Sequence, residues 1–240
     1  MSILSRVHFC TFGSLPDYGA ALARIERQAR DSKYFDSVNC YTEKTTPGLE
    51  AHTDFIARSP RGYGCWIWKP LVVLETMRKA EERDVIVYAD AGCFIHATPE
   101  AKRKFAEYLT LVKTTSPHRI SFQMPYPEEN YTKGDVLDLL NVRDTEHAKS
   151  GQIVGGYRFL LNTPENRALM EEWHRIMSYE NHHYHDDSPS RSPNAPTFVS
   201  PRHDQSVISL LMKVRGTLIV EDVYPPKNTD PISPMRSRRA

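Results

Sequence analysis

The sequence predicts an α/β fold in which helices flank a mixed, mostly parallel sheet. Strand-like and helix-like patterns alternate through the first half of the chain, which favours parallel strands joined by helical crossovers. The run from Val85 to Tyr88 places four apolar or aromatic residues in succession, as in a strand that is covered on both faces. The second half alternates less regularly, so its strands are expected to be mixed in direction. With 240 residues and 40% hydrophobic content, the chain can form the core of one domain.

Short runs of β-branched, aromatic and other apolar residues mark the expected strands. Gly13 follows the first run and ends it. Gly155 and Gly156 lie near the start of the run that ends at Leu161. The strand that ends at Tyr88 continues almost directly into Asp90. In chain order, the expected strands are residues 7–12, 37–41, 84–88, 119–124, 153–161 and 218–220.

Capping signals and apolar stripes mark the expected helices. The tripeptides 98–100 and 163–165 both read Thr-Pro-Glu, which combines an N-cap, a proline at the first helical position and an acidic first turn. Asp17 is expected to cap the first helix, Pro70 to open the second and Gly216 to end the last. A short helix is also expected over 133–140. The expected inward stripes are Leu22, Ile25 and Ala29; Leu71, Leu74 and Met77; Phe105, Tyr108, Leu109 and Val112; Leu169, Trp173 and Ile176; and Val207, Leu210, Leu211 and Val214.

Two irregular segments and a tail complete the organisation. Residues 124–132 and 181–200 are expected to be loops, and a loop of nearly twenty residues within a domain is usually functional or disordered. The expected domain is 1–224, followed by a flexible, locally basic tail over 225–240 that is rich in proline and arginine. The run His182-His183-Tyr184-His185-Asp186-Asp187 could be a metal cluster. Since adjacent residues cannot all converge on one ion, a mobile polar loop is the favoured interpretation.

Composition limits the classes of partner. The 31 Lys and Arg against 30 Asp and Glu give a net charge of +1, which argues against broad electrostatic binding to nucleic acid or membrane. The four cysteines show no CxxC spacing and predict neither a zinc site nor a disulfide framework. Neither a signal peptide nor a transmembrane run is recognisable. These features predict a cytoplasmic protein, with peripheral membrane attachment through the basic tail as an alternative.

The stretch from Arg61 to Cys93 carries the strongest functional signal. A loop rich in glycine and aromatic residues ends in Trp-Ile-Trp-Lys-Pro, a helix follows, and the next strand leads into Asp90. Many α/β enzymes hold a metal or a charged substrate group at the carboxyl edge of the sheet, where this aspartate is expected. The alternative is an ordinary core strand that ends in a solvated aspartate. Two tryptophans and a tyrosine beside a lysine favour a site, because such a surface is costly unless something packs on it.

Three motifs resemble a group of GT-A-type sugar-nucleotide glycosyltransferases from bacterial polysaccharide clusters and large viruses. The motifs are RGYG-WIWKP at residues 61–70, Y-x-D-A-G-C at 88–93 and RHDQS at 202–206. The resemblance spans roughly residues 5 to 224, and its first and last motifs are specific as a pair. It implies a nucleotide-sugar donor and a glycan, polysaccharide or other glycoconjugate acceptor. GT-A enzymes commonly carry Asp-x-Asp, whereas this chain has one carboxylate in the motif, Asp90.

The resemblance also implies roles for individual residues. Asp90 and His203 are expected to hold a divalent metal, Mn²⁺ or Mg²⁺, with Asp90 contacting the donor ribose or sugar as an alternative. Each residue also has a structural explanation: helix capping for His203 and Asp204, core packing for the tryptophans, a turn for the glycines and a solvated charge for Arg61 and Lys69. The residues expected to bind the donor and its diphosphate are Arg61, Trp66, Trp68, Lys69, Asp90, Gly155 and Gly156, and those expected next to the reacting carbon are Asp204, Gln205 and Lys69.

Two other function classes remain open. A catalytically degenerate GT-A domain that binds a sugar or nucleotide would explain the single carboxylate of the acidic motif. A nucleotidyltransferase or metal-dependent phosphohydrolase is less favoured, because such enzymes need several acidic residues clustered at strand ends and Asp90 stands nearly alone.

Overall fold

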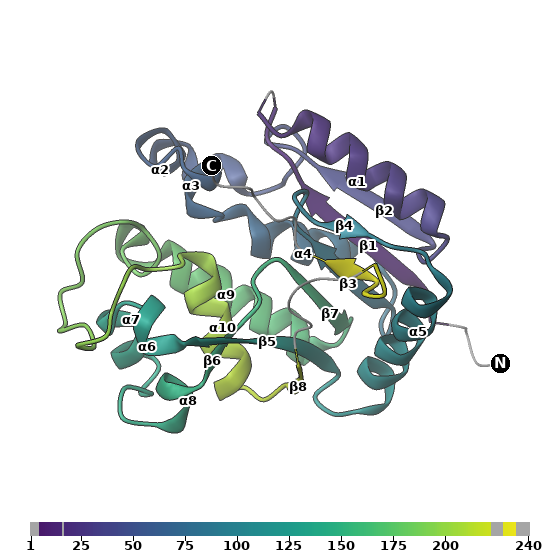
Figure 1. The fold of residues 1–240 in the computed structure, drawn as a ribbon. Helices are drawn as coiled ribbons and strands as arrows, with labels where there is room; N and C mark the ends of the chain where they lie inside the picture. Colours follow the sequence, from purple (N-terminus) through teal and green to yellow (C-terminus); the bar gives the residue numbers. More distant parts are fainter. Residues whose placement is uncertain (1–4, 16, 222–227, 234–240) are drawn as a thin grey trace.

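The computed structural model describes residues 5–15, 17–221 and 228–233, and its main feature is a seven-stranded sheet (Figure 1). The strand order is β2-β1-β3-β7-β5-β6, and β8 pairs with β5. Strands β1, β2 and β3 are mutually parallel, whereas β7 is antiparallel to β3 and β5, and β6 is antiparallel to β5. Because β8 is parallel to β5, five of the seven strands run in one direction. The predicted fold class, including the mixed second half, is confirmed. The strands are β1 (Val7–Phe12), β2 (Ser37–Tyr41), β3 (Val85–Ala89), β4 (Phe94–Ile95), β5 (Arg119–Pro127), β6 (Gly151–Ile153), β7 (Tyr157–Leu161), β8 (Leu218–Glu221) and β9 (Ile232–Ser233).

Helices cover both faces of the sheet, because alternate strand residues point to opposite sides (Figure 1). In β3, Ile86 and Tyr88 pack with α4, α9 and α10, whereas Val85 and Val87 pack with α1 and α5. All five residues of β3 are buried, as predicted for a strand covered on both faces. The helices are α1 (Gly19–Ser32), the 3-10 helix η1 (Leu49–His52), α2 (Thr53–Arg58), α3 (Gly62–Cys65), α4 (Trp68–Lys79), α5 (Pro99–Thr114), α6 (Glu128–Tyr131), α7 (Gly134–Leu139), α8 (Glu146–Lys149), α9 (Pro164–His182) and α10 (Asp204–Val214).

Two of the three expected N-caps form. Thr98 accepts a hydrogen bond from the backbone of Ala101 at the start of α5, and Thr163 does the same for Asn166 at the start of α9. The prediction for Asp17 is wrong, since α1 begins at Gly19 after Tyr18 and has no side-chain cap. Burial of the inward face of α1 stabilises this helix in place of the cap.

The strand expected over 153–161 is interrupted. Strands β6 and β7 both pair with β5, and the chain leaves the ladder between Ile153 and Tyr157. The displaced backbone includes Gly155 and Gly156, and it faces the end of β3, because the amide of Asp90 donates to the carbonyl of Gly156 at 2.7 Å.

Part of the expected tail is folded onto the domain. Strand β9 pairs with β4, Ile232 is buried, and Lys104 forms a 2.9 Å ion pair with Asp230. The boundary expected at 224/225 and the remaining tail residues, 225–227 and 234–240, lie outside the described residues.

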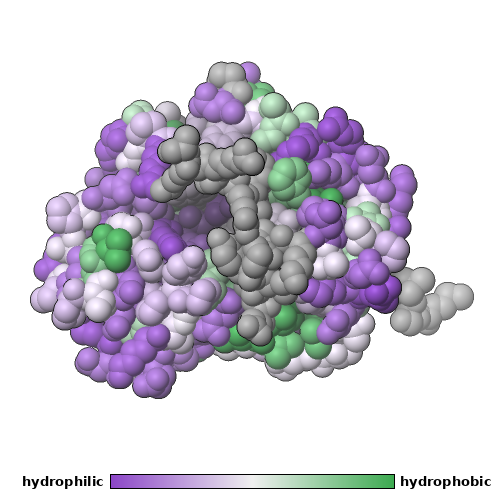
Figure 2. Space-filling model, in the orientation of Figure 1, coloured by the Kyte–Doolittle hydropathy of each residue, from purple (hydrophilic) through white to green (hydrophobic). Residues whose placement is uncertain are grey.

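The surface on the side drawn in Figure 2 is predominantly hydrophilic. A hollow opens near the middle of this face, and its visible lining is hydrophilic. Within the described ranges, no helix combines the length and the apolar content that a membrane crossing requires.

Candidate functional site

A cavity of about 430 Å³ lies at the carboxyl ends of β1 and β3. Segments far apart in the sequence form it: the end of β1, the turn before α4, the residues that follow β3 and the interruption between β6 and β7. The volume is within the usual range for small-molecule sites. The lining residues are Phe12, Gly13, Ser14, Tyr18, Gly62, Tyr63, Trp66, Trp68, Asp90, Ala91, Gly92, Cys93 and Gly156.

Aromatic residues of the RGYG-WIWKP motif form one wall of the cavity. Trp68 stacks on Phe12 with ring centroids 4.1 Å apart, and its indole N–H donates to the carbonyl of Gly62 at 3.0 Å. Gly62 has a φ of +61°, and a Cβ there would lie 2.5 Å from the Trp66 ring, so the turn requires glycine at this position. Trp66 adopts a φ of +64° just before α4 begins, so the two tryptophans do not belong to an extended segment, although both line the cavity.

Lys69 lies buried between two carboxylates at the base of this wall. Its ammonium lies 2.8 Å from Asp204 and 3.2 Å from Asp90, and it is 3.4 Å from the carbonyl of Gly155. Burial lowers the pKa of Lys69, but the charges of Asp204 and Asp90 outweigh burial and raise it overall. Lys69 therefore stays charged, and its charge is already balanced by protein groups.

Asp90 faces the cavity, with about a third of its side chain exposed (32%). The hydroxyl of Tyr88 donates to the Asp90 carboxylate, and Tyr88 itself is fully buried. Burial, followed by the charge of Asp90, raises the pKa of Tyr88 well above its usual value, so Tyr88 remains a donor. Asp90 thus lies at the carboxyl end of a central strand, as predicted.

The Gly155–Gly156 backbone connects this cluster to α10. The amide of Gly155 donates to the side-chain oxygen of Gln205 at 2.9 Å, and the Gln205 amide donates to Gln152 at 2.8 Å. A Cβ at Gly155 would lie 2.9 Å from the Gln205 Cβ, which leaves no room for a larger residue. The fold therefore brings Gly155 into contact with Gln205 and Lys69, and Gly156 into contact with Asp90.

The other predicted site residues lie around this cluster. His203 precedes α10, and its Nε2 is 2.9 Å from Asp187. The His203 ring also contacts Trp66, with centroids 5.3 Å apart. Arg61 is exposed, and its guanidinium lies 5.9 Å from the Trp66 ring centroid. Asp90 contacts Lys69, Tyr88 and Gly156, whereas His203 contacts Asp187 and Trp66, so the shared metal site of Asp90 and His203 stays a prediction.

Arg158 is a buried residue of this cluster that the sequence analysis did not single out. It is buried in β7, donates to the carbonyl of Gly155 at 3.2 Å, and lies 4.7 Å from the Trp173 ring centroid. Burial lowers the pKa of Arg158, and the charges of Asp204 and Asp90 offset only part of this effect. The signal was an arginine within the otherwise apolar run YRFLL, because an arginine is rarely buried unless it is paired.

The histidine run is not a mobile polar loop, and that expectation is wrong. His182, His183 and His185 are buried, and Phe55 stacks on His182 with centroids 3.8 Å apart. His52 bridges His182 and His174, with both nitrogen–nitrogen distances at 2.9 Å. The histidine rings therefore contact Phe55 and one another in place of solvent.

The chain of three histidines predicts that the protein loses stability in mild acid. Burial, followed by the charge of His52, lowers the pKa of both His174 and His182 to about 4. A group whose pKa is lower in the folded than in the unfolded state binds more protons on unfolding, so stability falls as the pH falls from about 6.5 towards 4. One fully buried imidazole with this pKa would lower the free energy of unfolding by about 2 kcal/mol between pH 7 and pH 5. Because His174 and His182 are partly solvated, we expect the two together to lower it by about 2 kcal/mol.

Urea unfolding at pH 7 and pH 5 measures this difference. His174→Gln should make the difference smaller, whereas His147→Gln, at an exposed position, should leave it unchanged. An equal pH dependence in His174→Gln and the unmodified chain would contradict the assignment.

Three solved structures are similar to the chain over most of its length. A glycosyltransferase involved in glycosylation of the major capsid of PBCV-1 has 12% identity and a TM-score of 0.49, with 97% of this chain and 94% of that chain covered. Mouse xyloside xylosyltransferase 1 in its apo form has 12% identity and a TM-score of 0.48, with 90% and 84% covered. The bifunctional glycosyltransferase WbbM has 11% identity and a TM-score of 0.47, with 91% and 39% covered. No protein-family model and no curated protein sequence matches the chain. At this identity the similarity concerns the fold and assigns no activity to this chain.

Proposed function

We propose that this chain is a glycosyltransferase that moves a sugar from a nucleotide-sugar donor to a glycan, polysaccharide or other glycoconjugate acceptor. The observation that carries the proposal is the aromatic cavity at the ends of β1 and β3, into which Asp90 projects beside the Lys69–Asp204 pair. The motifs that resemble nucleotide-sugar glycosyltransferases supply the residues of this cavity and of the groups behind it.

The aromatic wall suits the flat, apolar base of a nucleotide. The rings of Tyr18, Tyr63, Trp66 and Trp68 all line the cavity, and base–aromatic stacking typically contributes about 1–3 kcal/mol per base. Asp90 lies on the same cavity and can accept hydrogen bonds from ribose or sugar hydroxyls. A nucleotide sugar offers both a base to stack and hydroxyls to bind.

In this proposal Asp90 is the carboxylate that touches the substrate. Lys69, Asp204 and Gln205 are not among the residues that line the cavity, and they act as positioning residues. Lys69 and Tyr88 fix the Asp90 carboxylate, and Gln205 fixes the backbone at Gly155. Such preorganisation lets a site stabilise developing charge without reorienting during the reaction.

The metal that the resemblance implies does not fit the pair Asp90 and His203 as they are arranged. The ammonium of Lys69 already lies between Asp90 and Asp204, and His203 is grouped with Asp187 and Cys65 rather than with Asp90. No step of the proposed reaction is therefore assigned to a metal.

A second candidate is a sugar- or nucleotide-binding module without turnover. The contacts of Asp90 with Lys69 and Tyr88 favour it, because they already engage the single carboxylate of the acidic motif. The two candidates share the cavity and differ in whether the donor is cleaved.

A screen of UDP-, GDP-, dTDP- and CMP-sugars by thermal shift tests both. We expect one nucleotide class to raise the melting temperature, because a ligand that binds only the folded state stabilises it. Each sugar is screened with Mn²⁺, with Mg²⁺ and with a chelator. Release of free nucleotide from the stabilising donor supports the transferase, and stabilisation without release supports the binding module. No stabilisation and no release with any donor would refute both.

Trp68→Ala and Tyr108→Phe provide the matched comparison. Trp68 lines the cavity, whereas Tyr108 packs on the opposite face of the sheet. The donor-induced shift should disappear in the first variant and persist in the second.

A further inference from the structure

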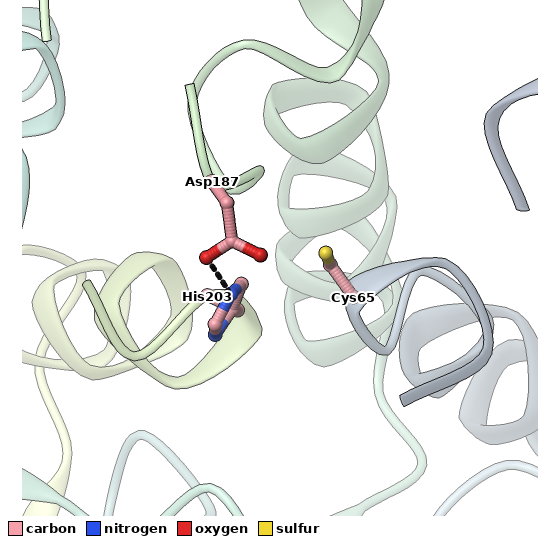
Figure 3. A group of neighbouring side chains, drawn as sticks. All are labelled: Cys65, Asp187 and His203. Atoms are coloured by element: carbon pink, nitrogen blue, oxygen red, sulfur yellow. Dashed lines mark hydrogen bonds and ion pairs between the residues drawn. The ribbon is translucent and has the colours of Figure 1, made fainter. Parts of the chain in front are cut away.

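Three side chains that commonly bind metals meet beside the aromatic wall. Cys65 ends α3, Asp187 follows α9, and His203 precedes α10, and one potential ligand atom from each lies within 4.8 Å of the others. Figure 3 shows the three side chains pointing toward one another from separate segments. Asp90 is not a member of this group.

Two of the three side chains are buried, and the third is exposed to solvent. Cys65 and His203 are almost completely buried, whereas the Asp187 side chain is 59% exposed. A cation can therefore enter past Asp187, and water can complete its coordination. Three protein ligands and one open position is a common arrangement for zinc.

The backbone is strained at both buried members of the group. Cys65 has a φ of +49°, and His203 has a φ of +50° with a ψ of −120°. Residues other than glycine rarely adopt such angles, at a cost of about 1–3 kcal/mol each, and such strain concentrates at functional sites. Here the strained positions are the ones that direct the thiol and the imidazole to a common point.

We propose that Cys65, Asp187 and His203 form a binding site for Zn²⁺. The donor set selects the metal: sulfur and imidazole ligands suit zinc, whereas Mg²⁺, Ca²⁺ and Mn²⁺ prefer oxygen. The charges also balance, because a thiolate and a carboxylate together neutralise a divalent cation. This site is separate from the metal position expected at Asp90.

When zinc binds, the thiol of Cys65 loses its proton and its sulfur bonds to the metal. Burial, followed by the charges of Asp187 and Asp186, raises the pKa of Cys65 to about 12, so the metal-free thiol is protonated at neutral pH. The metal takes the sulfur lone pair, and the thiol proton leaves to solvent. One proton is therefore released for each zinc bound.

The bound metal would fix one wall of the cavity. It joins the turn that carries Trp66 to the start of α10, where Asp204 follows His203 directly. The His203 ring already contacts Trp66, which lines the cavity. Zinc at this position therefore has a structural role: it fixes the aromatic wall and takes no part in the reaction.

Metal analysis of the full chain, purified without a histidine tag, tests the site. We expect one zinc per chain after equilibration with Zn²⁺ and removal of the excess. Substitution with Co²⁺ should produce a thiolate-to-cobalt charge-transfer band, which reports the sulfur ligand directly. Cys65→Ser should abolish the band and weaken zinc binding by at least about a hundredfold, as competition with a chromogenic chelator measures.

Two further variants make the result unambiguous. Asp187→Asn changes an exposed side chain, which should leave folding intact while weakening zinc binding. Cys40→Ser replaces a half-buried cysteine outside the group and should leave the stoichiometry and the band unchanged. Failure of the unmodified chain to retain zinc, or unchanged zinc binding in Cys65→Ser, would overturn the proposal. These readouts do not depend on transferase activity, so the site stands or falls independently of the proposed function.

Discussion

Lys69→Ala is expected to lower the free energy of unfolding by about 3–5 kcal/mol. The substitution removes the ammonium that lies 2.8 Å from Asp204, and Asp204 is buried. Removing one partner of a buried ion pair leaves an uncompensated charge, and this is much more costly than losing a surface pair. Chemical denaturation at neutral pH measures the change.

Two comparisons separate the contribution of the charge from that of the side-chain volume. Lys79→Ala removes an exposed lysine of the same helix that pairs with Glu75, and it should cost at most about 1 kcal/mol. Adding Asp204→Leu to Lys69→Met should recover stability relative to Lys69→Met alone, because the unpaired carboxylate is then gone. If Lys69 mainly binds the leaving diphosphate, as its sequence context suggests, Lys69→Ala will remain stable and lose turnover instead.

Asp90→Asn is expected to reduce nucleotide release by at least about a hundredfold, with less than about 1 kcal/mol of stability lost. Asn keeps the shape of Asp90 but replaces the carboxylate, which accepts charge-assisted hydrogen bonds from ribose or sugar hydroxyls, with a weaker neutral acceptor, and removing one preorganised polar group from an active site typically has an effect of this size. Stability should be retained, since the Lys69–Asp204 pair remains and Asp90 is partly exposed. Steady-state release of nucleotide from the stabilising donor measures the effect.

The control for Asp90→Asn is Asp144→Asn, which changes an exposed aspartate that is not among the residues lining the cavity. It should retain full activity. If Asp90→Asn retained it too, Asp90 would not be the carboxylate that faces the substrate. If it unfolded instead, the aspartate would have a structural role at the end of β3.

Local patterns predicted the elements well where the signal was complete within a few residues. The limits of β1 and β2 match the expected ranges, and both Thr-Pro-Glu signals begin helices. The predictions failed where contacts between distant parts of the chain decide the local structure. The strand expected over 153–161 is interrupted because the Gly155–Gly156 backbone bonds to Asp90 and Gln205 instead of continuing the ladder.

The sequence singled out several residues of the cluster beside the cavity, but not their arrangement. The motifs identified Lys69 as a cation beside aromatic rings, but its burial depends on Asp204, which lies 135 positions later in the sequence. For the same reason, the burial of the histidine run could not be read from its polar neighbours, since Phe55 and His52 provide its contacts from another part of the chain. Pairings of this kind arise only when the chain folds.

Strand β9 has a practical consequence for the design of recombinant protein. It forms a two-stranded sheet with β4, and β4 directly follows the residues 90–93 that line the cavity. The amide of His96 also donates to the carbonyl of Pro231 at 3.0 Å. Trimming the chain at residue 224, where the sequence predicts the domain to end, would therefore remove a strand from the support of the cavity edge. Low activity in such a shortened protein would report damage to that edge rather than the loss of a dispensable extension.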